Sequence, residues 1–240
     1  MEIELKGGFV THDPRLDRIP EYDPRNLDFL SRRTLTTLQP KEKTWKVAAH
    51  LDQGYEGACA GFAFSHLGLS APKINGWIDN DEARNLYFKA QKIDEWDGGA
   101  YPGAEPFYEG TSTLAAAKAG RNRGYFDAYK WTYDADELAL AVGYDGPSVI
   151  GVWWFENMME PDRNGFIHAT GEIVGGHCTL IYGVVPSEQY FKVWNSWGPS
   201  WGQDGTAKIS YADMDYILKS EGEACIPVKR GYVIDPHMRG

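Results

Sequence analysis

Residues 52–64 read DQGYEGACAGFAF, a polar, glycine-containing loop that runs into an apolar segment with Cys59 at the junction. Apolar residues such as Ala63 and Phe64 then recur at steps of three and four, which predicts a helix over residues 59–67. Cys59 would lie in its first turn, where free N–H groups and the helix dipole favour a thiolate. The alternative interpretation is that Cys59 is only a small buried residue, as free cysteines usually are.

Two later stretches favour a reactive Cys59 over a cysteine that is only buried. Residues 175–184 read GGHCTLIYGV, so that His177 enters an apolar, strand-like run, and residues 193–201 read VWNSWGPSW, with Asn195 flanked by aromatic residues. His177 and Asn195 follow Cys59 at distances of 118 and 136 residues. This order and spacing resemble those of the papain-like cysteine peptidases.

Three local motifs carry the resemblance, which covers residues 52–240. DQGYEGAC resembles the family's Gln-Gly-x-x-Gly-x-Cys loop, with Gln53 six residues before the cysteine. GGHCTLIYGV resembles its histidine-bearing strand, and NSWGPSWGQDGTAKIS resembles its Asn-Ser-Trp-Gly segment. The resemblance implies an α+β, papain-like fold, with a helical lobe, a β-rich lobe and the active-site cleft between them.

The resemblance also implies a role for each residue of the site. Cys59 is expected to be the nucleophile, and His177 to accept its proton and pass it to the leaving amine. Asn195 would accept the other ring N–H and hold the tautomer. Gln53 would donate its amide to the developing oxyanion. Trp197 is expected to shield the contact between His177 and Asn195 by packing against it.

The sequence also departs from the family pattern. Glu56 stands where the family usually has a disulfide-forming cysteine, Ala60 replaces the usual tryptophan, and Gly176 precedes His177 where many members have Asp or Asn. These departures resemble the short, disulfide-free bacterial and bacteriophage-encoded members. The glycine strand that pairs with the substrate backbone has no clear counterpart, and the candidates for it are Gly98, Gly99, Gly103 and Gly110.

Other histidines and a metal site are alternatives to the catalytic roles expected of Cys59 and His177. His66 lies two helical turns from Cys59, about 10.5 Å along a helix axis, so we expect it to be packed or at the surface. His168 has no motif around it. Neither a CxxC nor an HxxxH spacing joins the cysteines and histidines, so we expect no metal and no cofactor.

Composition narrows the class of partner and the compartment. A net charge of −10 argues against nonspecific binding to nucleic acid or to an anionic membrane. No apolar run approaches the ~18–20 residues of a membrane span, and residues 1–10 lack the pattern of a signal peptide. Three cysteines cannot form a complete set of disulfides. These features predict a cytoplasmic protein, with association with a virion as an alternative.

The chain divides into three predicted units: an extended arm (residues 1–45), a helical lobe with the nucleophile (46–132) and a β-rich lobe with the histidine and asparagine (133–240). Periodicity and caps predict helices at 59–67, 81–93, 112–119, 134–142 and 212–219, and strands at 45–51, 148–155, 177–185, 189–195 and 206–210.

The arm contains Pro14, Pro20, Pro24 and Pro40 and charges of both signs. This composition predicts extended, irregular structure. We expect the arm to lie along the outside of the β-rich lobe, where it braces the lobes or docks on a protein partner, and not to fill the cleft as an inhibitory propeptide does.

The predicted function is cysteine-dependent hydrolysis of peptide bonds in a polypeptide substrate, through a thioester acyl-enzyme. One alternative is a papain-like structural or assembly protein, for example of a phage particle, with weak or no turnover. The other is a transferase or deamidase that uses the same three residues.

Overall fold

The computed structural model describes residues 3–4, 10–11, 13–21, 23, 26, 30 and 38–228. Within these ranges the helices are α1 (Cys59–Gly68), α2 (Asn80–Gln91), α3 (Thr113–Asn122), α4 (Ala135–Tyr144) and α5 (Tyr211–Lys219), with 3₁₀ turns η2 (Glu156–Met158) and η3 (Pro186–Glu188). The strands are β1 (Ile3–Glu4), β2 (Val10–Thr11), β3 (Lys43–Thr44), β4 (Ala128–Thr132), β5 (Ser148–Phe155), β6 (Phe166–Ile167), β7 (Ile173–Val185), β8 (Tyr190–Trp194), β9 (Thr206–Ser210) and β10 (Glu223–Val228).

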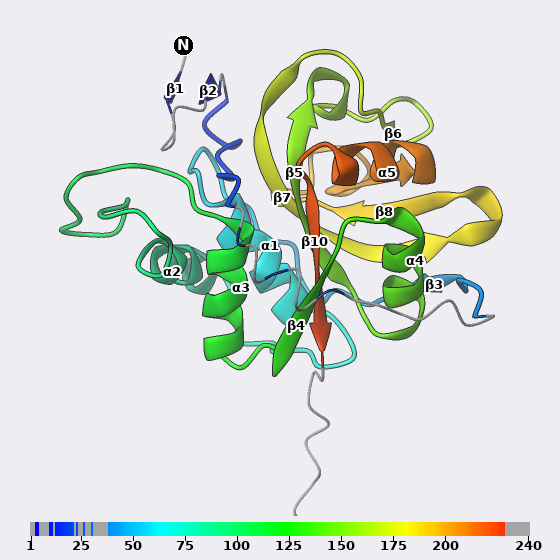
Figure 1. The fold of residues 1–240 in the computed structure, drawn as a ribbon, viewed down its shortest axis with the longest axis horizontal. Coiled ribbons are helices and arrows are strands. Elements are labelled where there is room, and N and C mark those ends of the chain that lie inside the picture. The colour runs from blue at the N-terminus through cyan, green and yellow to red at the C-terminus, as the bar shows by residue number, and fades with distance from the viewer. Residues whose placement is uncertain are drawn as a thin grey trace, which may run out of the picture.

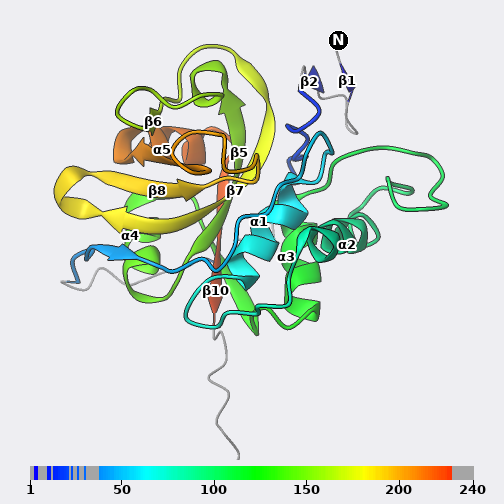
Figure 2. The same cartoon turned by 180° about the vertical axis from the view of Figure 1, so that it is seen from behind.

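The main sheet has the strand order β4-β10-β5-β7-β8-β9-β6, with β3 paired to β7. All of its pairs are antiparallel except β6 with β9. Successive residues of β5 face opposite sides of the sheet. Val149 packs in a core with α1, α2 and α3, whereas Ile150 packs in a second core with α4 and α5. The sheet therefore separates two helical layers, as the α+β prediction requires (Figures 1 and 2).

Helix α1 is buried along its whole length because its residues are small or apolar. Helices α2 and α3 begin within one residue of their predicted starts at 81 and 112: Asp79 accepts a hydrogen bond from the Glu82 N–H, and Ser112 accepts one from the Ala115 N–H. Together these helices place the N-terminal end of α1 beside strand β7.

Several predicted boundaries were wrong. Helix α3 does not end before Gly120 but continues through it to Asn122. The glycine packs against the Phe126 ring, which a Cβ would approach to 3.3 Å. Residues 45–51 do not form a strand; in that range only Val47 makes an isolated bridge, to Ser70. Strands β4 and β10, which pair with each other, were not predicted. The division at residues 45 and 132 stays a prediction.

The largest correction concerns the arm. Its residues 13–21 run between the helical layer and the sheet, not along the outside of the sheet (Figures 1 and 2). Asp17 forms a parallel bridge with Gly176 of β7, and Arg18 forms one with Thr111 on the helical side. Leu16 is fully buried. The arm pairs through backbone N–H and C=O groups, which almost every residue carries. Such pairing needs no periodicity in the sequence, so the sequence predicted irregular structure where a strand-like pairing occurs.

Among the described residues, no helix combines the length and the apolar character needed to cross a bilayer.

Candidate active site

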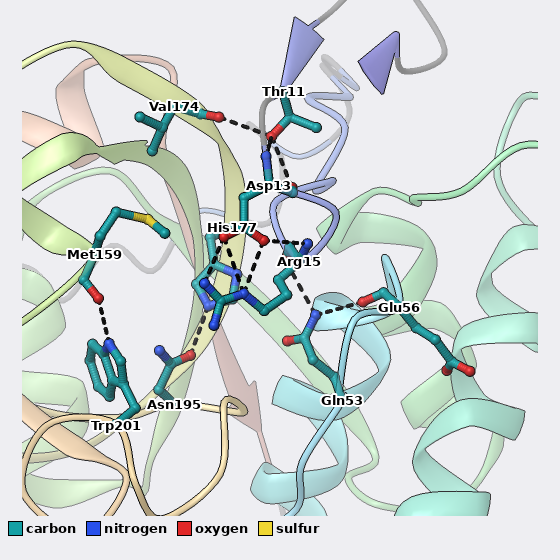
Figure 3. A network of polar contacts seen from close by, with 10 residues as sticks. All are labelled: Thr11, Asp13, Arg15, Gln53, Glu56, Met159, Val174, His177, Asn195 and Trp201. Atoms are coloured by element: carbon teal, nitrogen blue, oxygen red, sulfur yellow. Dashed lines mark hydrogen bonds and ion pairs between the residues drawn. The ribbon is translucent and has the colours of Figure 1, made fainter. Parts of the chain in front are cut away.

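The predicted site residues come from four separate elements, and Figure 3 shows three of them, Gln53, His177 and Asn195. Cys59 begins α1, His177 lies within β7, Asn195 follows β8, and Gln53 lies in the loop before α1. The pairing of β7 with β8, in which Leu180 is opposite Trp194, brings the histidine and the asparagine together.

His177 and Asn195 form a fully buried pair, with 2.8 Å between Nε2 and Oδ1. The same Oδ1 accepts a hydrogen bond from the Ser196 N–H at 2.9 Å. Because that oxygen can only accept, Nε2 of the ring must be the donor. The other nitrogen, Nδ1, is buried without a hydrogen-bond partner among the described residues, and in this tautomer it is free to accept a proton.

Two tryptophans enclose the His177 ring. The centroid of Trp197 lies 4.8 Å from it and that of Trp154 lies 4.7 Å from it. Trp197 therefore lies where the sequence predicts its packing role. Trp154 was not predicted; the signal available was its position in the apolar run of β5, where it pairs with Gly175, two residues before the histidine.

The Cys59 side chain is only 1% exposed. Burial raises the pKa of its thiol well above the usual value, the neighbouring Cys178 thiol raises it further, and the imidazole of His177 acts in the opposite direction. With the arm in place, the thiol is therefore held in its neutral form. Helix α1 has no side-chain cap at its N-terminus, so the N–H groups of its first turn are left for other acceptors.

The Gln53 amide already contacts a peptide carbonyl. Its Nε2 donates to the Glu56 carbonyl at 2.8 Å and to the Arg15 carbonyl of the arm at 3.3 Å. Its Oε1 accepts from the Ser196 hydroxyl at 2.6 Å, which fixes the orientation of the amide. The donor is thus aimed at the backbone that occupies the site (Figure 3).

Within the described part of the arm, Asp17 contacts the nucleophile. The Cys59 thiol donates to Oδ1 of Asp17 at 3.8 Å. Oδ2 of Asp17 is buried without a partner among the described residues. A Cβ on Gly57 would lie 1.2 Å from that Oδ2, so a glycine is required there for the aspartate to enter. Burial raises the pKa of the Asp17 carboxyl well above its usual value, and the facing Cys59 and Glu109 raise it further.

This raised pKa predicts that the arm is held more weakly as the pH rises. Docking favours the protonated form of the Asp17 carboxyl. The stabilisation of the docked arm by Asp17 is therefore complete below the pKa of a free aspartate, about 3.9. It is lost as the pH rises through the raised pKa of the docked carboxyl. We expect the alkylation rate of Cys59 in the wild type, divided by that in Asp17→Asn, to increase by up to about tenfold per pH unit in that range. The asparagine variant stays neutral and therefore reports thiol ionisation alone. A ratio that is constant with pH would contradict this prediction.

Two further glycines, Gly176 and Gly110, lie against the backbone carbonyls of the arm. A Cβ on Gly176 would lie 2.1 Å from the Arg18 carbonyl oxygen, and one on Gly110 would lie 2.4 Å from that of Asp17. Of the four glycines proposed to pair with a backbone, Gly110 is thus the one that the structure places against an extended chain. The other three have no arm atom among the nearest neighbours of a Cβ.

The competing histidines lie outside the site. His66 is fully buried, and its Nε2 accepts from the Leu51 N–H at 2.9 Å. Burial lowers the pKa of His66 to about 3, so it is a packed, neutral histidine, as predicted. His168 lies 3.2 Å from Asp162 at the surface. In the described part of the chain, no three His, Cys, Asp or Glu side chains are grouped to hold a metal ion.

Residues 80–225, over half of the chain, match the model of the papain family cysteine proteases. The matched range contains the histidine and the asparagine but begins after Cys59. The chain is 28% identical over 163 residues to the cathepsin B-like protease 1 of Arabidopsis thaliana, a match that covers 60% of this chain and 43% of that protein. It is 29% identical over 86 residues to cathepsin B of Dictyostelium discoideum, covering 35% and 28%. The chain thus spans less than half the length of these relatives.

Solved structures agree on the fold. Xylellain, a cysteine protease from Xylella fastidiosa, superposes with a TM-score of 0.63 at 14% identity, covering 91% of this chain and 98% of that one. The recombinant stem bromelain precursor superposes with a TM-score of 0.52 at 15% identity, covering 91% and 76%. At these identities the similarity establishes a papain-like fold.

Proposed function

The chain belongs to the papain family of cysteine proteases, and from this premise we propose that it hydrolyses peptide bonds in polypeptide substrates through a thioester acyl-enzyme. The observation that carries the proposal is the buried hydrogen bond between His177 and Asn195, which leaves Nδ1 free on the ring that lowers the Cys59 pKa.

The proposed steps follow from the positions of these atoms. Nδ1 of His177 takes the thiol proton of Cys59, and the thiolate attacks the carbonyl carbon of the substrate. The Gln53 amide, which already donates to a peptide carbonyl, stabilises the oxyanion. The imidazolium then donates its proton to the leaving amine, which leaves a thioester on Cys59. A water molecule, deprotonated by His177, hydrolyses the thioester. Asn195 holds the ring throughout, and Trp197 excludes water from that hydrogen bond.

We propose that the arm keeps this site latent. Residues 13–21 lie between the helical layer and the sheet, and the nucleophile beneath them is 1% exposed. A substrate must therefore displace these residues. Since the described arm contacts the chain itself, docking on a separate partner would require the same displacement.

We also propose that the protein works in a reducing compartment such as the cytoplasm, because Cys59, Cys178 and Cys225 are all free. Bacterial or phage origin and association with a virion stay predictions that rest on the resemblance.

The reaction class can be tested by its products. The full chain carrying Arg18→Ala, which removes the ion pair of the arm with Glu223 and leaves the backbone path free, should be incubated with a peptide library and a primary amine, and the products analysed by mass spectrometry. We expect cleaved peptides and no products when Cys59→Ala is added. Amine-linked peptides would indicate a transferase and loss of side-chain amides a deamidase; no product from any peptide would contradict enzymatic function.

A further inference from the structure

A second thiol, which the proposed mechanism does not use, lies beside the nucleophile. Cys59 begins α1 and Cys178 lies within β7, two elements that pack against each other. Both residues are buried in the core on the helical side of the sheet. Their thiols come within hydrogen-bonding range of each other. Both are free in this structure, so the pair is a dithiol that has not been joined.

The geometry of β7 directs the second thiol toward α1. His177 and Cys178 are successive residues of this strand, so their side chains leave opposite faces of the sheet. The His177 ring packs against two tryptophans of the second core, whereas Cys178 lies in the core with α1. Gly151, which is opposite Cys178 on β5, has no side chain. The polar contacts of the Cys178 thiol are therefore with the helical layer, where the Thr113 hydroxyl lies 3.5 Å from its sulfur.

The third cysteine does not share this arrangement. Cys225 is buried on β10, opposite Trp131 of β4. The ionisable groups that interact with its thiol are Glu223 and Tyr129, and neither is a thiol. Cys225 is therefore a matched control, a buried cysteine of the same core without a thiol beside it.

The chemistry of Cys59 makes a neighbouring thiol consequential. A thiolate is the form of cysteine that hydroperoxides oxidise, and in the proposed mechanism His177 takes the proton of Cys59. The first product, a sulfenic acid, is reversible, but a further equivalent of hydroperoxide converts it irreversibly to a sulfinic acid. A thiol that is already beside the sulfenic acid acts at an effective concentration far above that of any dissolved reactant. Cys178 is placed to react first.

We propose that Cys59 and Cys178 form a redox switch, in which a hydroperoxide oxidises Cys59 and Cys178 traps the product as an intramolecular disulfide. The disulfide removes the nucleophile without destroying it, and a dithiol reductant restores both thiols while it is itself oxidised to a disulfide. This inference goes beyond peptide hydrolysis, because it requires the two thiols and a proton acceptor but no substrate.

The two oxidation steps balance as follows. The Cys59 thiolate attacks the hydroxyl oxygen of the hydroperoxide, so that an S–O bond forms, the O–O bond breaks and the leaving alkoxide takes the proton held by His177. The sulfur of Cys178 then attacks the sulfenic sulfur. An S–S bond forms, the S–O bond breaks, and the leaving hydroxide takes the proton of Cys178 to become water. The two thiols together lose two electrons, which the hydroperoxide gains.

The test uses the full chain carrying Arg18→Ala, which removes the ion pair of the arm with Glu223. Excess hydrogen peroxide is applied until neither thiol nor sulfenic acid remains at Cys59. Mass spectrometry of the unreduced digest should then find Cys59 joined to Cys178, with Cys225 still a free thiol, and dithiothreitol should restore the labelling of Cys59 by iodoacetamide. Adding Cys178→Ala should lower the restored fraction at least about tenfold, since Cys59 then passes to the sulfinic and sulfonic acids. Adding Cys225→Ala should change neither result.

Three outcomes would overturn the proposal: sulfinic acid at Cys59 as the main product in a chain that keeps Cys178, equal recovery with and without Cys178, or a disulfide that includes Cys225. The readouts are a covalent bond and a labelling rate, so they do not depend on peptide cleavage. If no peptide is cleaved but Cys59 and Cys178 form the disulfide, the peptidase proposal fails and the disulfide stands. If peptides are cleaved and Cys59 is oxidised only to sulfinic acid, the switch fails and the peptidase stands.

Discussion

Replacing Gly176 by alanine should raise the rate at which iodoacetamide modifies Cys59 by about 10²-fold or more, which corresponds to about 2.7 kcal/mol of lost docking free energy. The new Cβ would lie 2.1 Å from the carbonyl oxygen of Arg18 and 3.1 Å from its carbonyl carbon. Both are backbone atoms, so the clash cannot be relieved by turning a side chain. The arm must move away, which uncovers Cys59, a residue that is 1% exposed while the arm is docked.

The rest of the site should tolerate this change. The other edge of β7 is unaffected, because Gly176 pairs there with Trp153 of β5, and its backbone does not have the positive φ that would exclude alanine. Gly76→Ala is the matched control, since a Cβ at that exposed position meets no atom within 4 Å. Mass spectrometry should find the label on Cys59 and not on the buried Cys178 or Cys225, which would react only if the chain unfolded. A rate equal to that of the wild type would show that the arm does not protect the thiol.

Features with a local cause were predictable. The starts of α2, α3 and α4 were predicted to within one residue. Each helix is capped by a side chain that contacts the backbone within four residues, and these caps are Asp79, Ser112 and Asp134. The runs of β5 and β9 are apolar or alternating, and their predicted bounds, 148–155 and 206–210, match the structure. Cys59, His177, Asn195 and Gln53 were found because each lies in a short motif, although their roles remain proposals.

Features caused by distant pairing were not predictable. Strand β4 has mixed polarity, and its partner β10 follows some ninety residues later, with Trp131 opposite Cys225; neither strand has a pattern of its own. The arm is a stronger case. Its position depends on two carbonyls, those of Thr111 and Gly176, which accept from it. Backbone acceptors leave no trace in the sequence, and only two glycines, Gly110 and Gly176, hinted that a chain passes closely there.

The ion pair between Glu223 and Arg18 could not be predicted for the same reason, because it joins residues that are distant in the sequence. They lie 205 residues apart, and each alone resembles an ordinary surface charge. Their pairing is visible only once the arm is placed between α3 and β10. A sequence that appears to leave a Pro-rich arm free thus encodes a segment that contacts and covers the nucleophile.

Gln53→Ala should lower kcat by about 10²–10³, with little change in KM, when it is measured on peptide cleavage in the Arg18→Ala chain. The Gln53 amide donates to the arm's Arg15 carbonyl at 3.3 Å, and the Ser196 hydroxyl fixes its orientation at 2.6 Å. In the proposed mechanism this donor binds the oxygen more tightly when the oxygen becomes negative, so its loss is felt in the transition state more than in the bound substrate.

Two comparisons separate donation from packing. Gln53→Glu keeps the size of the side chain but replaces the donor by an acceptor, so its kcat should fall at least as far as that of Gln53→Ala. Ser196→Ala removes the hydroxyl that orients the amide and should cost less than either. Alkylation of Cys59 by iodoacetamide passes through no oxyanion, so the Gln53 variants should react with it at nearly the rate of their parent. If Gln53→Glu retained the kcat of its parent, the amide would not be an oxyanion donor, and the stabilising group would have to be sought among the free N–H groups at the start of α1.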